Sequence, residues 1–407
     1  MIPPVLFCSV HIAYYLWYGN PVHDGKWMHW DHKTLPHWDP PTDKKFPKSV
    51  HDPAHDRAHS PYRPRRGFYS SRDPETMTAH FQEIAAMGID SVMFSWWGRA
   101  SLPGLKRDDA DSGANTDLLV RLALRTAKEY ASTVRLSFHV EPYEGRSAAT
   151  FERDCEYIGE EYVHAAGSEF QAFFVYDVSS RHTPRAERHA WRSALTRIRH
   201  LYQEKYGVAA FFFCLWVEGE KDLGFVQEVG FDGGYSYFAA TRFTPASDAG
   251  QWPRLLGSPG MAAHFVPSVG PGYDDTRIRP WNAHNRRSRE DQDSSLGATG
   301  VGASNSYYDR MWRNALDYKM VTITSYNEWG ESTQIEPAEV HQNNTALPFP
   351  YLSYPANDPH FYLRKTKKWV AEFKQKCAER YLGGGDLASR NGGGKTKEAT
   401  MRGVEDL

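Results

Sequence analysis

Short runs of β-branched and aromatic residues recur along the chain, and turn residues bound each run. The runs lack the regular polar positions of an open antiparallel sheet, which is typical of parallel strands buried on both faces. We predict strands at 5–18, 91–97, 134–141, 172–177, 208–217, 234–239, 263–269 and 320–329.

Most of these runs are followed by a segment with helical apolar spacing. The predicted helices are 74–87, 116–130, 149–164, 184–206, 221–229 and 306–318, with 361–380 as the closing helix. Eight strands alternating with helices over about 370 residues fit an α/β fold of the (β/α)8 TIM-barrel type. A doubly wound sheet fits less well, because residues 18–21 after the first strand carry no G-x-G-x-x-G motif.

We predict one catalytic barrel at 1–382 and a Gly- and Lys-rich tail at 383–407 that has no apolar period and is disordered. Two long excursions, 19–73 and 270–305, are rich in Pro, His, Asp and Arg. In a barrel they are long βα loops, which follow strands one and seven and lie on the catalytic face.

Composition narrows the class of protein. The 407 residues are 40% hydrophobic and 24% charged, with a net charge of −2, which argues against a nucleic-acid binder because such proteins carry a basic surplus. No apolar run is long enough to cross a membrane, so a membrane anchor is expected to be absent from this chain.

The four cysteines, Cys8, Cys155, Cys214 and Cys377, show no C-x-x-C spacing, so neither a zinc knuckle nor a disulfide scaffold is predicted. Cys8 and Cys214 lie in predicted inner strands and are expected to be buried and free.

Two acidic residues give the sharpest chemical signal. Glu328 and Glu331 lie three apart at the carboxyl end of the last predicted strand, with Trp329 between them. In a barrel that end faces the active site, and two carboxyl groups in different environments can divide the roles of base and acid. The alternative is that Glu328 and Glu331 only form ion pairs with arginines and have no catalytic role. We favour the active site over this alternative.

Other polar residues end predicted strands. Glu141 ends the third strand, where it either pairs with Arg146 or binds a ligand. Tyr235 and Tyr237 stand at alternate positions of the sixth strand, so we expect them on one face, where one hydroxyl binds substrate or both pack in the barrel.

The first long loop is dense in His, Asp and Trp, and includes Trp30 and His32. No recognised ligand spacing is present, so we expect neither a metal nor another cofactor and favour sugar stacking and hydroxyl hydrogen bonds. Trp97, at the end of the second strand, adds an aromatic wall, with core packing as its alternative.

Several aromatic and acidic motifs follow one another in a characteristic order. They are Tyr14-Tyr15-x-Trp17-Tyr18-Gly19-Asn20-Pro21, Asp24-Gly25-Lys26, His29-Trp30-x-His32, Leu35-Pro36-His37-Trp38, Tyr69-Ser70-Ser71-Arg72-Asp73-Pro74, Glu141-Pro142-Tyr143, Gly230-Phe231-Asp232-Gly233, Pro267-Ser268-Val269-Gly270-Pro271-Gly272-Tyr273, Ile278-Arg279-Pro280-Trp281-Asn282 and Asn327-Glu328-Trp329 through Gln334-Ile335-Glu336. From about residue 10 to residue 369, the chain resembles glycoside hydrolase family 99, the endo-α-1,2-mannosidases.

The resemblance implies a metal-free (β/α)8 hydrolase that cleaves an internal α-1,2-mannosyl bond with retention of configuration. Its substrate would be a glucosylated high-mannose oligosaccharide or N-glycoprotein, from which it releases glucosylated mannose. By motif, Glu328 matches the base that deprotonates the mannose 2-hydroxyl to give a 1,2-anhydro sugar, and Glu331 matches the general acid. Glu141 and one tyrosine of the sixth strand match positions that contact substrate, and we expect Tyr15, Trp30, His32, Trp97 and Trp329 to join them.

The chain also departs from the family pattern. Gly330 and Ser332 stand where we expect His and Gly, and Trp97-Gly98-Arg99 replaces an expected Tyr-Pro-Pro. These changes bear on substrate preference, so an endo-α-1,2-mannanase acting on mannan and a catalytically silent carbohydrate-binding barrel remain alternatives. Animal members are membrane-anchored in the Golgi, which makes the Golgi lumen the expected location.

Overall fold

The computed structural model describes residues 1–407 except 100–114, 164–167, 259, 288–305, 342–349 and 383–407. The tail predicted to be disordered, and the later part of the second long loop, lie outside the described residues.

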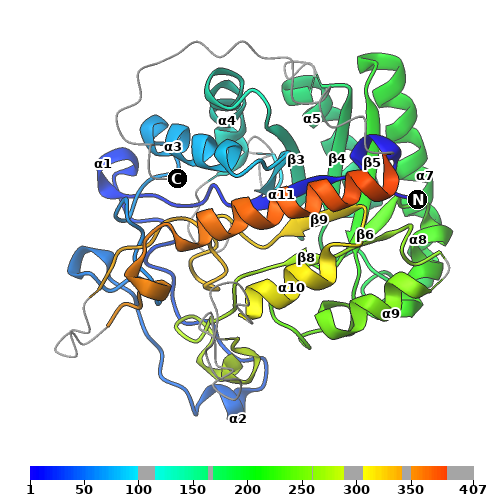
Figure 1. Ribbon diagram of the computed structural model, residues 1–407. Helices are drawn as coiled ribbons and strands as arrows, with labels where there is room; N and C mark the ends of the chain where they lie inside the picture. Colours follow the sequence, from blue (N-terminus) through cyan, green and yellow to red (C-terminus); the bar gives the residue numbers. More distant parts are fainter. Residues whose placement is uncertain (100–114, 164–167, 259, 288–305, 342–349, 383–407) are drawn as a thin grey trace.

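Parallel strands form the centre of the molecule (Figure 1), in the order β7-β6-β5-β4-β3-β2-β1-β9-β8. They are β1 (Ser9–Tyr14), β2 (Ser91–Trp96), β3 (Arg135–Val140), β4 (Phe170–Val175), β5 (Ala209–Leu215), β6 (Gly233–Tyr235), β7 (Phe265–Val266), β8 (Ser268–Val269) and β9 (Met320–Ile323).

β7 and β8 are two halves of one barrel position. β7 pairs with β6 and β8 pairs with β9, and only Pro267 separates them. Proline has no N–H to donate, so the ladder is interrupted there. Within the described part of the chain, the nine strands therefore occupy eight positions of a nearly closed barrel, and the predicted TIM barrel is confirmed.

Helices surround the strands (Figure 1), and the seven predicted helices are present with shifted ends. The α-helices are α1 (Pro21–Asp24), α2 (Pro40–Asp43), α3 (Pro74–Ala86), α4 (Asp117–Tyr130), α5 (Ala148–Ile158), α7 (Arg185–Leu201), α8 (Asp222–Val229), α9 (Trp252–Gly257), α10 (Tyr307–Ala315) and α11 (Phe361–Tyr381). The π-helical turns Gly159–Val163 and Tyr202–Tyr206 continue α5 and α7. Short 3-10 turns are Pro4–Leu6, Pro53–His55, Gly219–Lys221, Pro245–Ser247, Ala249–Gln251, Pro280–Asn285 and Pro355–Asn357.

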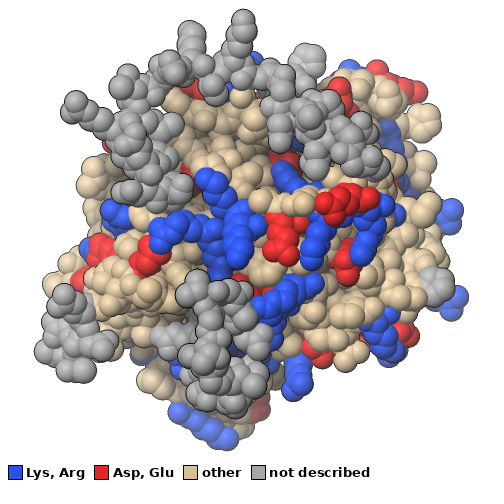
Figure 2. Space-filling model, viewed as in Figure 1, with Lys and Arg blue, Asp and Glu red and all other residues tan. Residues whose placement is uncertain are grey.

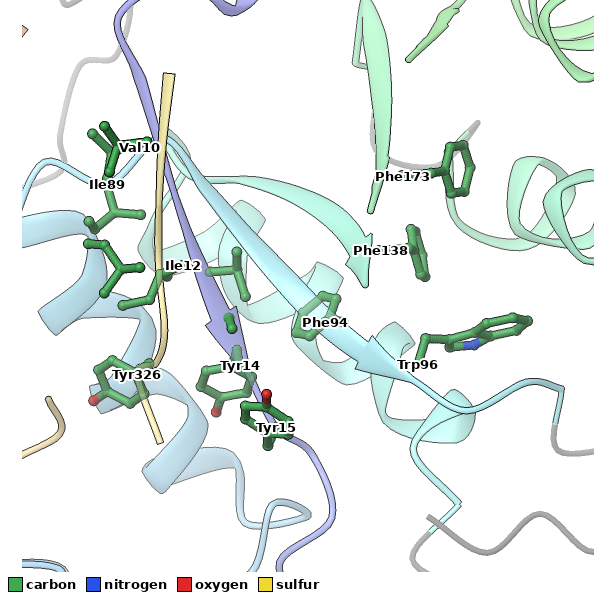
Figure 3. Close-up of a cluster of buried hydrophobic side chains, with 14 of the residues drawn as sticks. Val10, Ile12, Tyr14, Tyr15, Ile89, Phe94, Trp96, Phe138, Phe173 and Tyr326 are labelled. Atoms are coloured by element: carbon green, nitrogen blue, oxygen red, sulfur yellow. The ribbon is translucent and has the colours of Figure 1, made fainter. Parts of the chain in front are cut away.

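Alternate residues of each strand serve two separate cores. Phe94, Phe138 and Phe173 lie at one register level on β2, β3 and β4 (Figure 3) and belong to the layer between the strands and the helices. Their neighbours Met93 and Phe174 belong to a second cluster that fills the barrel. Because side chains alternate across a strand, this pattern requires strands buried on both faces, as the sequence predicted.

A disulfide joins Cys8 and Cys377, with their Cα atoms 5.4 Å apart. The expectation that Cys8 is free was wrong, because Cys8 precedes β1 rather than lying within it, and its N–H donates to the Lys319 carbonyl just before β9. α11 brings Cys377 to the same place, where its sulfur lies 3.8 Å from that carbonyl oxygen. Cys155 and Cys214 are buried and free, as predicted for Cys214.

Lys and Arg side chains gather over α11 in Figure 2, which is viewed as Figure 1. Several are neutralised in ion pairs, including Lys365 with Asp309 and Lys374 with Asp90. This face therefore carries local pairs rather than a uniform positive field. None of the described helices combines the length and apolarity that a membrane crossing requires.

Candidate active site

A cavity of about 870 Å³ opens at the carboxyl ends of the barrel strands. Six residues that the sequence analysis selected line it: Tyr15, Trp97, Glu141, Tyr237, Glu328 and Glu331. They come from the segments that follow β1, β2, β3, β6 and β9, so the barrel brings together residues that are far apart in the sequence.

Asn327 fixes the segment that carries the two glutamates. Its side-chain amide donates to the Tyr15 carbonyl and accepts from the Tyr15 N–H, at 2.9 and 2.8 Å. The Tyr18 hydroxyl donates to the Asn327 carbonyl at 2.7 Å. Because these buried bonds join the end of β9 to the end of β1, Glu328 and Tyr15 are held on adjacent walls of the cavity.

Glu328 is nearly enclosed. Its carboxylate oxygen Oε1 accepts from the Gly330 N–H at 3.0 Å, and its own N–H donates to the Ser325 hydroxyl at 2.8 Å. Only 4% of Glu328 is exposed, whereas 21% of the Glu331 side chain is. Water therefore reaches Glu331 more readily than Glu328.

The protonation of the pair is set by burial and by one arginine. Burial raises the pKa of Glu328 well above its usual range, and the nearby charge of Glu331 adds to the rise. Burial also raises the pKa of Glu331, but the Arg279 guanidinium, 3.1 Å from Oε1 of Glu331, opposes that rise. Two coupled carboxyl groups of this kind favour a state in which they share one proton.

Glu141 is held by a buried chain of hydrogen bonds. Its Oε1 lies 2.7 Å from Nδ1 of His139 and accepts from the Ser95 hydroxyl at 2.8 Å. The other ring nitrogen of His139 lies 2.7 Å from the Tyr235 hydroxyl. Arg146, the partner considered from the sequence, donates instead to the Val140 carbonyl.

The two tyrosines of the sixth strand have different places. β6 ends at Tyr235 and Tyr237 has a φ of 53°, so Tyr237 lies beyond the strand, although both side chains belong to the cluster inside the barrel, as expected for one face. Tyr235 is fully buried behind His139, whereas Tyr237 lines the cavity and shares a hydrogen bond with the Tyr15 hydroxyl. The structure therefore brings Tyr237, and not Tyr235, to the site.

Three further predicted residues lie outside the cavity lining. Trp30 is completely buried and stacks on Tyr18 with ring centroids 4.1 Å apart. Trp329 is also buried, and its indole N–H donates to Glu336 at 2.9 Å. His32 packs against other histidine rings of the first loop. These three side chains are packed in the interior and do not line the cavity.

Some residues that line the cavity were not selected from the sequence. Trp17 and Tyr176 stand on its aromatic walls, and Arg279, Trp38 and Trp281 come from the two long loops. The signal that could have selected them was the length of the loops after the first and seventh strands, because such loops build the active-site face of a barrel.

Histidines of the first loop pack ring to ring, with His29 5.2 Å from His32 and 5.0 Å from His59 between centroids. Within the part of the chain that the structure describes, no group of three or more His, Cys, Asp or Glu side chains is arranged to hold a metal ion.

Comparisons with known proteins agree with this geometry. Residues 6–375 match the family described as Glycosyl hydrolase family 99. The chain is 35% identical over 386 residues to the glycoprotein endo-alpha-1,2-mannosidase of Mus musculus, covering 92% of this chain and 76% of that protein. It is 34% identical over 380 residues to the glycoprotein endo-alpha-1,2-mannosidase-like protein of Homo sapiens, covering 90% and 76%. The solved structure of the GH99 endo-alpha-mannosidase from Bacteroides thetaiotaomicron superposes with a TM-score of 0.72 at 32% identity, covering 91% of this chain and 99% of that one.

Proposed function

We propose, because this chain belongs to glycoside hydrolase family 99 and is an endo-α-mannosidase, that it cleaves an internal α-1,2-mannosyl bond of glucosylated high-mannose N-glycans. The observation that carries the proposal is the pair Glu328 and Glu331 in one cavity walled by Tyr15, Tyr237 and Trp97. Two carboxyl groups carry out catalysis in most glycosidases, and flat aromatic side chains can stack on pyranose rings.

In the proposed route, neither glutamate bonds to the sugar. Glu328 takes the proton of the mannose 2-hydroxyl, and that oxygen attacks its own anomeric carbon while the bond to the leaving sugar breaks. Glu331 gives a proton to the departing oxygen, so a 1,2-anhydro sugar and a shortened glycan result. Glu331 then takes a proton from water as it opens the anhydro ring, and Glu328 returns its proton to the 2-oxygen. Two displacements at one carbon retain the configuration.

This route needs one proton on the pair, located on Glu331. Before substrate binds, Arg279 favours the charged form of Glu331, which places the shared proton nearer Glu328. Substrate must therefore move the proton as it binds. Substrate favours that transfer in two ways. The 2-hydroxyl beside Glu328 donates a hydrogen bond to a carboxylate, and the glycosidic oxygen beside Glu331 accepts one from a protonated carboxyl group.

The proposed location is the Golgi lumen. N-glycans of glycoproteins are luminal, and the disulfide between Cys8 and Cys377 favours an oxidising compartment.

Product analysis tests the function. A glucosylated oligosaccharide and a matched one ending in mannose are offered separately, and we expect glucosylated mannose to be released at the higher kcat/KM. Faster release of a mannose disaccharide would instead favour the mannanase alternative. Binding of both oligosaccharides without turnover would mean a silent carbohydrate-binding barrel.

A further inference from the structure

One tryptophan at the mouth of the cavity is unusually open to solvent. Trp38 lines the cavity and is 79% exposed. Burying an indole contributes more than burying almost any other side chain, so an indole left open beside a cavity is available to a ligand.

Two neighbouring rings contact the indole. The His37 ring lies against it with centroids 3.8 Å apart and an interplanar angle of 30°, and Trp281 meets it edge to face at 5.2 Å. Since His37 covers one face, most of the exposed area of Trp38 belongs to the opposite face and the ring edge.

Hydrogen bonds hold this support in place. Nδ1 of His37 accepts from the Asp39 N–H at 3.0 Å, and Asp39 caps α2 by accepting from the Thr42 N–H at 3.1 Å. The Leu35 N–H donates to the Ile278 carbonyl at 2.7 Å, which ties the first long loop to the second. A platform ordered before binding loses little conformational entropy when a ligand arrives.

The platform also has a defined position relative to Glu331. Trp281 follows Arg279 by two residues, and Arg279 contacts Glu331 at 3.1 Å. Glu331 is the proposed acid for the departing oxygen, so this side of the cavity receives the leaving part of the glycan.

We propose that Trp38 is a sugar-stacking platform that binds mannose residues on the leaving-group side, beyond the cleaved bond. This inference rests on the proposed function for the identity of that side. An indole face suits the C–H face of a pyranose ring, and it stacks on such a ring without selecting particular hydroxyl groups. The platform thus favours long, mannose-rich leaving groups over small ones.

Kinetics with two substrates test the platform. Both carry the same sugars before the cleaved bond, but one leaves as a mannose oligosaccharide and the other as an aryl group. We expect Trp38→Ala to lower the ratio of kcat/KM for the first substrate to that for the second by roughly 3- to 10-fold. Trp38→Phe should restore most of the ratio, because it keeps a flat ring. Tyr130→Ala is the matched control, since Tyr130 is 46% exposed at the end of α4 and does not line the cavity.

A binding measurement tests the Trp38 platform separately from the proposed function. Calorimetric titration with the mannose oligosaccharide that forms the leaving group should show weaker binding to Trp38→Ala than to wild type and to Tyr130→Ala. If wild type turns over neither substrate, the proposed function fails and the platform is judged on this titration alone. Equal binding by all three proteins, or an unchanged kinetic ratio, would overturn the platform.

Discussion

Nη1 of Arg279 lies 3.1 Å from Oε1 of Glu331 and 3.1 Å from Oδ2 of Asp275. One guanidinium therefore bridges a cavity carboxylate and a buried carboxylate of the second long loop. The position of this cation makes the protonation of Glu328 and Glu331 depend on a residue that does not itself exchange protons.

Replacing Arg279 should displace the pH profile of the enzyme. The cation lowers the pKa of both glutamates, so Arg279→Met raises both values. Both limbs of the kcat/KM profile report the pair of glutamates in the free enzyme, so raising both pKa values moves the whole bell to higher pH. Measurements of kcat/KM between pH 4 and 9 check this, with Arg279→Lys as the charge-keeping control. A profile at the wild-type position in Arg279→Met contradicts the electrostatic role.

Each glutamate should be indispensable for turnover. Glu328→Gln and Glu331→Gln keep the shape of the side chain but remove its proton exchange, so we expect kcat to fall roughly 10²–10⁴-fold in each. Oligosaccharide binding, measured by calorimetry, should persist because the aromatic walls are unchanged. Activity within a few-fold of wild type in one variant would remove that residue from its proposed role.

The sequence predicted the features that depend on residues close together in the chain. Buried parallel strands have a recognisable composition, so the barrel and the position of the acidic pair at the end of β9 followed directly. Loop side chains were harder, because the direction in which they point depends on distant partners. Trp30 and Trp38 stand in the same loop and look alike in sequence, yet the first is completely buried and the second is exposed.

Long-range pairings were the other limit. A backbone hydrogen bond from the Leu35 N–H to the Ile278 carbonyl ties the first long loop to the second. The disulfide joins Cys8 to Cys377, which lies 369 residues away in the sequence. Neither pairing leaves a local pattern. Glu141 shows the same limit, since its neighbour in the sequence, Arg146, was considered as a partner while Ser95, on another strand, bonds to it.

Loss of the disulfide should destabilise the barrel. The link between Cys8 and Cys377 closes almost the whole chain, and such constraints typically contribute about 2–4 kcal/mol. We expect dithiothreitol to lower the Tm of wild type and to leave the Tm of the Cys8→Ser/Cys377→Ser variant unchanged. The reduced wild type and the double variant should then melt at similar temperatures. A wild-type Tm insensitive to the reductant would contradict this prediction.

Gly330 and His59 should behave as a compensating pair. A Cβ atom at position 330 would lie 2.8 Å from Cδ2 of His59 and 3.1 Å from Oε1 of Glu328, and His59 is completely buried.

Gly330→Ala therefore forces the His59 imidazole or the Glu328 carboxylate to move, and we expect kcat to fall about tenfold or more, because small misplacements of reacting groups are costly. The double variant His59→Ala/Gly330→Ala removes the obstructing ring and should recover part of that loss. Gly257→Ala serves as the matched control, since a Cβ there meets no atom within 4 Å. Full activity in Gly330→Ala, or a double variant no better than the single one, would show that His59 does not dictate glycine at position 330.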